Sequence, residues 1–487
     1  MRVCLANDSF PPLIDGVSNT VVNSGKISQS KYGAAVVATP RYPGVKDEYP
    51  FEVVRYASLN TVKLVGYRTG YPFAQDAMER LSAFRPNIIH SHCPMASLFL
   101  CRELRDITRV PLVFTYHTKF DIDIKRAVKL KFIHEPAIRE VINNIKAADD
   151  VWVVNRGAGE NLKSLGYEGD YIVMPNGVDI DRTPADAALI EAVERDCGLG
   201  PGVPVLLFVG RVLWYKGLRI ILDGLRQVKD SGQRFRMIFV GNGNDLENVK
   251  KYASDVGLGG DCVFTGAIYD RAMLKAYYSR ADLFLLPSVF DNNPLVVKEA
   301  AACGTASVLI RDSSSAEGVT HCDNGILIGG NTGAVNSAND GAGENVGDSQ
   351  KSREGTDEST KRCADDLARE LTALLRNPTE VKRLGERAAD TLYVSWDDSI
   401  ARAVKRYDEV LARYHEKGYV PSRARYDAGI KFIGETYHGI IKAKLLGLGI
   451  KSEFEDQLRD ARDSYDTAIT WLKEKYDMIK DYFDRYQ

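Results

Sequence analysis

Short apolar runs alternate with amphipathic helical patterns along most of the chain, in two successive series. Strands that alternate with helices form βαβ units and therefore parallel sheets. Val205–Val209 is apolar at every position, as expected for a strand buried on both faces. The runs predict an α/β protein with two consecutive parallel-sheet domains of similar size. They are Val3–Ala6, Ala34–Ala38, Ile88–His90 and Val110–Thr115, then Val205–Val209, Arg236–Val240, Cys262–Thr265, Leu283–Leu286 and Ala306–Ile310.

Turn-forming residues and local composition suggest where the domains begin and end. Met174–Asp179 is rich in Pro, Gly and Asn, so we expect one domain over 1–175 and a second over 176–395. Residues 329–362 are rich in Gly, Asn, Ser, Asp and Glu and nearly lack large apolar side chains. This composition predicts a disordered insertion in the second domain, with the helical pattern resuming near Ala364.

Residues 418–487 form an extension with two helical stripes. The stripe over Tyr426–Ile440 lies in a net basic segment, and the stripe over Phe454–Phe483 lies in a net acidic one. We expect a helical hairpin. The basic arm could bind an anionic membrane, the arms could pack on each other or on the other domains, or the second arm could form a homodimer. Packing or assembly is favoured, because an anionic surface would repel the acidic arm.

Composition excludes several classes of protein. The formal net charge is −2, whereas a nucleic-acid-binding protein would usually carry a basic stripe, so no nucleic-acid partner is expected. The eight cysteines include no C-x-x-C pair and read as reduced, buried thiols. The N-terminus turns polar at Asn7 and Asp8, too soon for a signal peptide, and no apolar run is long enough to span a membrane. A cytoplasmic setting is expected.

A helix start follows an apolar strand in the stretch Leu286–Gly304. Asn292 or Asn293 can cap this helix, and Pro294 suits its first turn. The helix begins at the carboxyl edge of a parallel sheet, where ligands of open α/β folds bind. Its N-terminal N–H groups and dipole favour a diphosphate.

Two carboxylates belong to the same stretch. Asp291 precedes the helix and can face a cleft, and Glu299 lies about a turn and a half into the helix, where it can bind ribose hydroxyls. The ordinary alternative is a helix cap and a surface glutamate. The local pattern does not decide between these interpretations.

Two cations, Arg211 and Lys216, follow the first strand of the second domain. A leaving diphosphate accumulates charge in the transition state, and positive side chains aimed at it stabilise that charge. In isolation, two solvated surface cations are the simpler interpretation.

The first domain offers a glycine and a histidine at strand ends. Gly16 lies between the first strand and the first helix, where a missing side chain lets a phosphate or sugar approach the backbone, or simply permits a tight turn. His117 ends another strand and could hold a sugar hydroxyl, although a lone histidine is more often structural. His90 and His92 carry the same ambiguity.

Two D-x-D pairs resemble metal-binding motifs. They are Asp121 with Asp123 and Asp179 with Asp181. Alternating aspartates are common by chance, and no further ligand cluster accompanies either pair. No metal is therefore expected, and without G-x-G-x-x-G no dinucleotide cofactor is signalled.

Together and in this order, the motifs resemble the retaining glycosyltransferases of family four over roughly residues 1–416, apart from the insertion. The resemblance implies the GT-B fold, with two facing Rossmann-like domains, plus the C-terminal helical extension. Ser395 and Trp396 resemble the family's signal before a last helix, expected over 396–417, that crosses back to the first domain.

The resemblance also implies roles for particular residues. Arg211 and Lys216 match the cation pair on the donor diphosphate, and Asp291 matches the first acid of the E-x7-E motif, which contacts the transferred sugar. Glu299 matches the second acid, on the ribose. His117 matches the cleft histidine near the sugar.

Gly16 matches the family's N-terminal loop glycine, and two departures affect the donor loop. Asp291 stands where glutamate is commoner, so its carboxylate reaches about one methylene less far. Pro294 stands where glycine is usual and removes one N–H from the phosphate-facing turn, which leaves Leu295 and Val296 to donate theirs.

The expected activity is metal-independent transfer of a hexose from a nucleotide sugar, most simply UDP-glucose, with no cofactor. The pattern around Asp291 resembles subfamilies that act on diacylglycerol, so the acceptor is expected to be a membrane lipid. The enzyme would be cytoplasmic, with peripheral contact to the inner face of the membrane. The alternatives are a soluble sugar or polysaccharide precursor as acceptor, and a non-catalytic scaffold.

Overall fold

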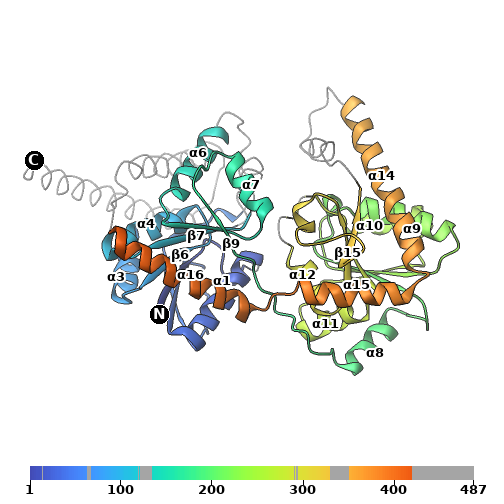
Figure 1. Ribbon diagram of the computed structural model, residues 1–487, viewed down its shortest axis with the longest axis horizontal. Helices are drawn as coiled ribbons and strands as arrows, with labels where there is room; N and C mark the ends of the chain where they lie inside the picture. The colour runs from blue at the N-terminus through green and yellow to red at the C-terminus, as the bar shows by residue number, and fades with distance from the viewer. Residues whose placement is uncertain are drawn as a thin grey trace, which may run out of the picture.

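Two lobes, each built around one parallel sheet, lie side by side (Figure 1). The computed structural model describes residues 1–13, 15–62, 67–118, 120, 134–289, 291, 294–329 and 350–418. Strand order is β3-β2-β1-β6-β7-β8-β9 in the first sheet and β12-β11-β10-β13-β14-β15 in the second. The expectation of an α/β chain with two parallel-sheet domains is confirmed.

The N-terminal sheet carries the predicted apolar runs in its centre, where neighbouring strands bury them. Tyr56 and Trp152, on strands missed by the sequence reading, are also buried. The strands are β1 (Arg2–Ala6), β2 (Ala34–Pro40), β3 (Glu52–Tyr56), β6 (Ile88–Ser91), β7 (Leu112–Tyr116), β8 (Asp150–Val153) and β9 (Ile172–Val173), with a small antiparallel pair of β4 (Ser58–Leu59) and β5 (Thr69–Gly70). The helices are α1 (Gly16–Ile27), η1 (Ser28–Tyr32), α3 (Gln75–Ala83), α4 (Ala96–Thr108), α6 (His134–Ile145) and α7 (Arg156–Ser164).

The C-terminal sheet has fully buried central strands, because helices cover both of its faces. Its strands are β10 (Val205–Val209), β11 (Arg236–Val240), β12 (Cys262–Gly266), β13 (Leu283–Leu286), β14 (Ala306–Ile310) and β15 (Gly325–Ile328). Its helices are α8 (Ala187–Asp196), η3 (Trp214–Lys216), α9 (Leu218–Asp230), α10 (Leu246–Asp255), α11 (Arg271–Arg280), α12 (Leu295–Ala302), η4 (Ser314–Ala316), α14 (Gln350–Leu374) and α15 (Pro378–Thr391).

Helix α16 (Trp396–Lys417) returns from the second lobe and lies along the first (Figure 1). Ala403, Tyr407 and Val410 join a buried cluster with Trp152 and Val37 of the N-terminal sheet. Although α16 lies far along the chain, it is part of the N-terminal core.

The chain crosses between the domains twice, and the two crossings lie against each other. Val178 bridges to Ser395, and its N–H donates to the carbonyl of Val394 at 3.1 Å. A Cβ on Gly177 would stand 2.5 Å from the backbone of Trp396, so only glycine allows this approach.

The disorder expected over 329–362 can be compared with the structure only at the two ends of that range. Helix α14 begins at Gln350, so the expectation of disorder is wrong for 350–362, while 330–349 lie outside the described residues. A scarcity of large side chains argues against a packed core, but a helix needs only one buried stripe. Ser359, Cys363 and Leu367, four residues apart, supply that stripe and are buried.

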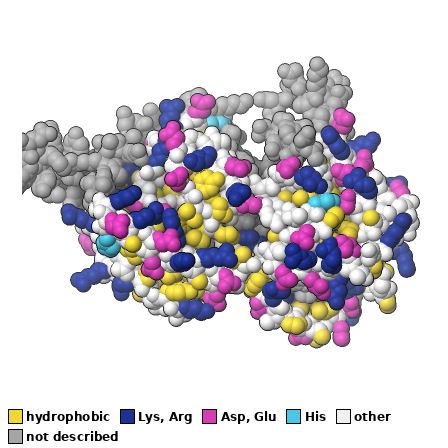
Figure 2. Space-filling view, viewed as in Figure 1, with side chains coloured by type: hydrophobic (Ala, Val, Ile, Leu, Met, Phe, Trp, Pro, Cys, Tyr) yellow, Lys and Arg dark blue, Asp and Glu magenta, His cyan; other side chains and the backbone are white. Residues whose placement is uncertain are grey.

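Two further observations concern the hydropathy and the charge of the described residues. None of its helices is long and apolar enough to cross a bilayer. Figure 2 shows acidic and basic side chains interspersed over both lobes on this face. The extension 418–487 falls outside the described residues after Gly418.

Candidate functional site

The loops after β10 and β13 lie against each other at the carboxyl edge of the second sheet. Gly217, which follows η3, has φ 79°, and a Cβ there would stand 2.0 Å from the carbonyl oxygen of Pro287. Glycine is required on both counts, since a side chain would be strained and would collide with backbone. This close approach brings Lys216 beside Asp291.

Lys216 and Asp291 form an ion pair through the lysine Nζ and the aspartate Oδ1. Both side chains are largely covered, with 14% and 17% of their surfaces exposed. The other oxygen of Asp291, Oδ2, is buried without a hydrogen-bond partner in the described structure. A buried, unsatisfied carboxylate oxygen is costly unless a donor reaches it, and a sugar hydroxyl is such a donor.

Arg211 lies on the same edge but is exposed, and its Nη2 donates to the hydroxyl of Tyr215 at 3.3 Å. Among the described residues, Arg211 forms no salt bridge with a carboxylate. A guanidinium in this state can move to an anionic ligand at little cost.

Helix α12 begins at Leu295, one residue later than expected, with Pro294 at its N-cap position. Asn292 and Asn293, the expected caps, lie outside the described residues. The first N–H groups of a helix have no intrahelical partner, so Leu295 and Val296 present theirs at the helix start. A helix that starts at Leu295 therefore keeps both N–H donors that the sequence predicts, those of Leu295 and Val296.

Glu299 is buried, with 6% of its surface exposed, so it is not the surface glutamate of the ordinary alternative. Its Oε1 accepts from Arg271 Nη2 at 2.6 Å and its Oε2 accepts from the hydroxyl of Tyr278 at 3.1 Å. Both oxygens already have partners. A ribose hydroxyl that binds Glu299 must share the carboxylate with Arg271 or displace this half-exposed side chain.

On the facing edge, in the N-terminal domain, Gly16 is the first residue of α1. Asp15 caps this helix by accepting from the N–H of Ser18 at 2.7 Å. A Cβ on Gly16 would meet nothing within 4 Å. The fold itself therefore does not require glycine here, and the open space would admit a ligand.

His117 follows β7 and is buried among other histidines. Its Nε2 lies 2.9 Å from Nδ1 of His92, and the ring of His92 packs against that of His90 at a tilt of 31°, with centroids 4.1 Å apart. His90 in turn contacts the hydroxyls of Tyr407 at 2.5 Å and Thr115 at 2.7 Å. Burial lowers the pKa of both His90 and His117 to about 3, so both rings are neutral at pH 7.

The carboxyl edges of the two sheets touch beside Asp291. Glu317 accepts from the N–H groups of Arg156 at 2.7 Å and Gly157 at 3.1 Å, which places an acid at the N-terminus of α7. Asn155 Nδ2 donates to the carbonyl of Ser314 at 3.2 Å. The next residue, Ser315, donates its hydroxyl to the backbone carbonyl of Asp291 at 2.9 Å.

Asp179 and Asp181, one of the two D-x-D pairs, bind protein groups. Asp179 Oδ1 accepts from Trp396 Nε1 at 2.7 Å and from Asn23 Nδ2 at 2.9 Å, and Asp181 pairs with Lys275. This pair joins structural elements. The other pair, Asp121 and Asp123, lies outside the described residues.

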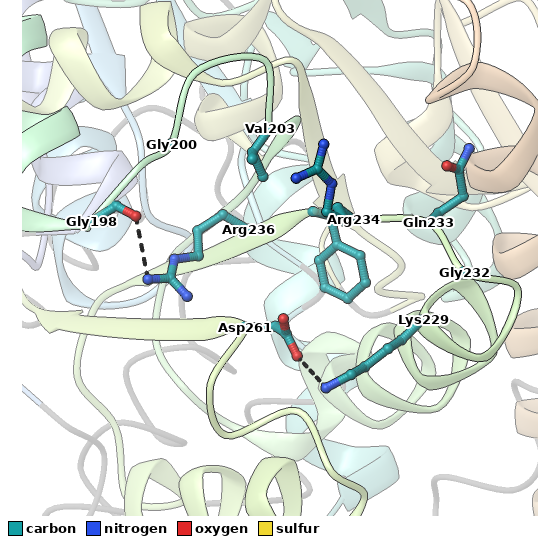
Figure 3. A pocket seen from close by; sticks show the side chains of 10 residues that line it. Gly198, Gly200, Val203, Lys229, Gly232, Gln233, Arg234, Arg236 and Asp261 are labelled. Carbon is teal, nitrogen blue, oxygen red and sulfur yellow. Dashed lines mark hydrogen bonds and ion pairs between the residues drawn. The ribbon is translucent and has the colours of Figure 1, made fainter.

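A surface pocket with a volume of about 410 Å³ lies at the opposite, amino-terminal edge of the second sheet. Figure 3 shows the Arg236 guanidinium at the carbonyl of Gly198 and Lys229 at Asp261. Lys229 also donates to the carbonyl of Gly257 at 2.8 Å. These two cations already hold loops together, and none of the predicted site residues lines the pocket, so it is not the candidate site.

Two family models match the two domains in turn. Residues 14–182 match the model described as Glycosyltransferase Family 4, and residues 191–362 match the one described as Glycosyl transferases group 1. The first range carries His117, and the second carries Lys216 and Asp291. The chain belongs to the family-four glycosyltransferases.

Curated relatives of this glycosyltransferase act on different molecules according to their names. It is 22% identical over 314 residues to the alpha-monoglucosyldiacylglycerol synthase of Streptococcus pneumoniae, covering 63% of the chain and 70% of that protein. It is 29% identical over 261 residues to the D-inositol 3-phosphate glycosyltransferase of Corynebacterium jeikeium, covering 50% and 60%. It is 26% identical over 282 residues to a sulfoquinovosyl transferase of Arabidopsis thaliana, covering 57% and 53%. In the last two, the match spans less than two thirds of the relative.

Solved glycosyltransferase structures share the fold of this one. The Anabaena protein HepE in complex with UDP aligns with a TM-score of 0.60 at 17% identity, covering 84% of this chain and 100% of that one. Sucrose-phosphate synthase from Thermosynechococcus elongatus aligns with a TM-score of 0.61 at 18% identity, covering 85% and 99%. The glycosyltransferase has the GT-B fold.

Several residues that surround the predicted site residues are not predicted from the sequence. Arg271, Tyr278 and Glu317 occupy or flank the site, and only Arg271 carried a usable signal, as a cation directly after the Asp270 cap. The sequence leaves the role of His92 open. Its contact with His117 depends on how neighbouring strands pair, which the sequence does not state.

Proposed function

We propose that the protein is a retaining glycosyltransferase that moves a hexose from a nucleotide sugar, most simply UDP-glucose, to an acceptor. The observation that carries the proposal is the covered Lys216–Asp291 pair, with a buried, unpartnered carboxylate oxygen at the start of α12. A cation and a sugar-binding acid side by side suit the point where the diphosphate joins the hexose.

Each predicted residue has a role in this proposal. Lys216 and Arg211 neutralise the diphosphate, assisted by the N–H groups of Leu295 and Val296. Glu299 binds the ribose when Arg271 shares the Glu299 carboxylate with a ribose hydroxyl. Two further residues, His117 and Asp291, hold the hexose, and the space at Gly16 admits the donor.

The proposed chemistry needs no protein nucleophile. The bond from the sugar C1 to the diphosphate oxygen breaks, and the acceptor oxygen bonds to C1 on the same face. The acceptor proton passes to the departing phosphate oxygen, which leaves as part of UDP. The protein supplies position and charge stabilisation.

The proposed acceptor is a membrane lipid such as diacylglycerol, reached from the cytoplasmic face by peripheral contact. The Streptococcus pneumoniae relative, named for a glucosyldiacylglycerol product, supports this choice. The second candidate is a soluble acceptor, which the relatives named for inositol 3-phosphate favour.

A panel of nucleotide sugars tests the donor. The correct donor increases the free energy of unfolding by RT ln(1 + [L]/Kd) and so raises the melting temperature, and a donor-hydrolysis assay then shows whether the bound sugar is released. Stabilisation by a UDP-hexose with slow hydrolysis supports the proposal. Stabilisation without hydrolysis or transfer to any acceptor indicates a scaffold, and no stabilisation by any nucleotide sugar contradicts the donor site.

Chelation is expected to leave activity intact, because the proposed charge stabilisation comes from Lys216 and Arg211. Transfer is measured after dialysis against EDTA, and again with Mn²⁺ or Mg²⁺ added back. Equal rates agree with the proposal. Complete loss in EDTA, with recovery on adding either metal, would show that a metal binds the diphosphate instead.

A further inference from the structure

A pair of buried imidazoles lies at the carboxyl ends of β6 and β7, two neighbouring strands of the N-terminal sheet (Figure 1). His92 Nδ1 and His117 Nε2 are 2.9 Å apart, so one of these nitrogens donates and the other accepts. His92 is 3% exposed and His117 is 6% exposed, so neither hydrogen-bonding role is easily supplied by bulk water.

Each ring carries one proton. Burial lowers the pKa of His117 to about 3 and moves the pKa of His92 well below its usual value, with the neighbouring histidines adding to the second shift. A neutral imidazole has one N–H and one bare nitrogen. The proton of His92 is therefore on either Nδ1 or Nε2.

The other nitrogen of His92 decides between these two forms. Nε2 is buried and has no hydrogen-bond partner among the described residues. Among buried backbone groups, an N–H without an acceptor is rarer than a carbonyl without a donor, and we apply the same preference to the ring nitrogens. The proton of His92 therefore belongs on Nδ1, which donates to Nε2 of His117.

We infer that His92 is a positioning residue for sugar transfer: it fixes His117 as the tautomer that carries its proton on Nδ1. His117 can then donate to a sugar oxygen only through Nδ1. The inference deepens the proposed function, because it rests on His117 holding the hexose. The adjacent ring of His90, held by Tyr407 and Thr115, packs against the His92 ring and keeps it in place.

Three substitutions at His92 separate the two ring nitrogens. His92→Asn places an amide near the position of Nδ1, His92→Gln places one near Nε2, and His92→Leu offers neither. We expect His92→Asn to keep most of the turnover with UDP-glucose. The other two should lose about 10–100-fold in kcat, as happens when a metal-bound histidine loses the hydrogen-bond partner that orients it.

The KM for UDP-glucose is expected to stay near the wild-type value, since the proposed nucleotide contacts lie in the other domain. His415→Leu, at an exposed position of α16, is the control for losing a histidine and should match wild type. Activity retained by His92→Gln but not by His92→Asn would overturn the inference, because Nε2 would then be the functional atom. Equal activity in all three variants would also overturn it.

Imidazole ¹⁵N chemical shifts give a readout that does not require activity. In the wild-type protein with ¹⁵N-labelled histidine, we expect His117 to show a protonated Nδ1 and a bare Nε2. The opposite tautomer would refute the inference even if the enzyme is active. Should the wild-type protein transfer no sugar, the proposed function fails, and the ¹⁵N shifts still decide the tautomer.

Discussion

Lys216→Ala is expected to reduce sugar transfer by about 10²–10³-fold in kcat while the protein remains folded, because one preorganised contact to transition-state charge typically supplies this much. Arg211→Ala should act in the same direction. Both are measured as kcat at saturating donor, with melting temperature as the check on folding. Lys250→Ala removes an exposed lysine of the same domain and should leave the rate unchanged.

Lys216 also neutralises Asp291, so Lys216→Ala removes two interactions at once. The same substitution made in the Asp291→Asn protein separates them. In Asp291→Asn, the carboxylate charge is gone and its pairing with Lys216 no longer matters. If Lys216 contacts the diphosphate, Lys216→Ala still lowers kcat strongly in this background. If Lys216→Ala has no further effect in the Asp291→Asn protein, the lysine acts only by neutralising Asp291. Near-normal rates in both Lys216→Ala and Arg211→Ala would show that the donor does not bind at this edge of the sheet.

Asp150→Ala is expected to destabilise the protein by about 3–5 kcal/mol, the usual cost of removing one partner from a buried ion pair. The Asp150 carboxylate is 7% exposed and accepts from Arg406 at 2.8 and 2.9 Å, from Arg413 at 2.7 Å and from Trp152 Nε1 at 2.6 Å. The variant would leave a buried indole N–H without its partner and leave the Arg406 charge paired with Glu409 alone. Urea unfolding measures the loss, and Asp323→Ala, which breaks an exposed pair with Arg387, should leave the stability nearly unchanged because water screens that pair.

The same carboxylate predicts a pH dependence. Burial raises the pKa of Asp150, but hydrogen bonds from Arg406, Arg413 and Trp152 outweigh this, and the net shift is downward. A lowered pKa stabilises the folded state above the unfolded-state pKa of about 3.9, and the stabilisation disappears as pH falls through the folded-state value. The difference in stability between wild type and Asp150→Asn should therefore be constant near pH 7 and shrink below about pH 4. A difference that does not change with pH would contradict the ionic role.

The sequence predicted the centres of both sheets because buried parallel strands must be apolar throughout. It missed β8, which begins with Asp150, and the edge strand β3, which is only partly buried and includes Glu52 and Arg55. A charged residue at the start of a strand favours a loop in a prediction from local sequence, because the residues that neutralise its charge lie elsewhere in the chain. The arginines that pair with Asp150 come from α16, far along the chain.

The candidate site was predictable as motifs but not as contacts. Strand ends placed Lys216 and Asp291 at one sheet edge, since parallel strands end together. Their pairing depends on the close approach at Gly217, and the occupation of Glu299 by Arg271 depends on how α11 packs beside α12. Such contacts arise from packing between distant segments, which local patterns do not encode.

The return of α16 to the first lobe also sets the order in which the chain can finish folding during synthesis. The second domain is contiguous over 176–395, whereas the first needs Ala403, Tyr407 and Val410 to cover Trp152. At about 5–20 residues per second, a ribosome takes about 10–50 s to travel from residue 175 to residue 417. Throughout that interval an apolar face of the nascent first domain stays uncovered and open to chaperones. Of the two domains, the one made first is thus the last to be completed.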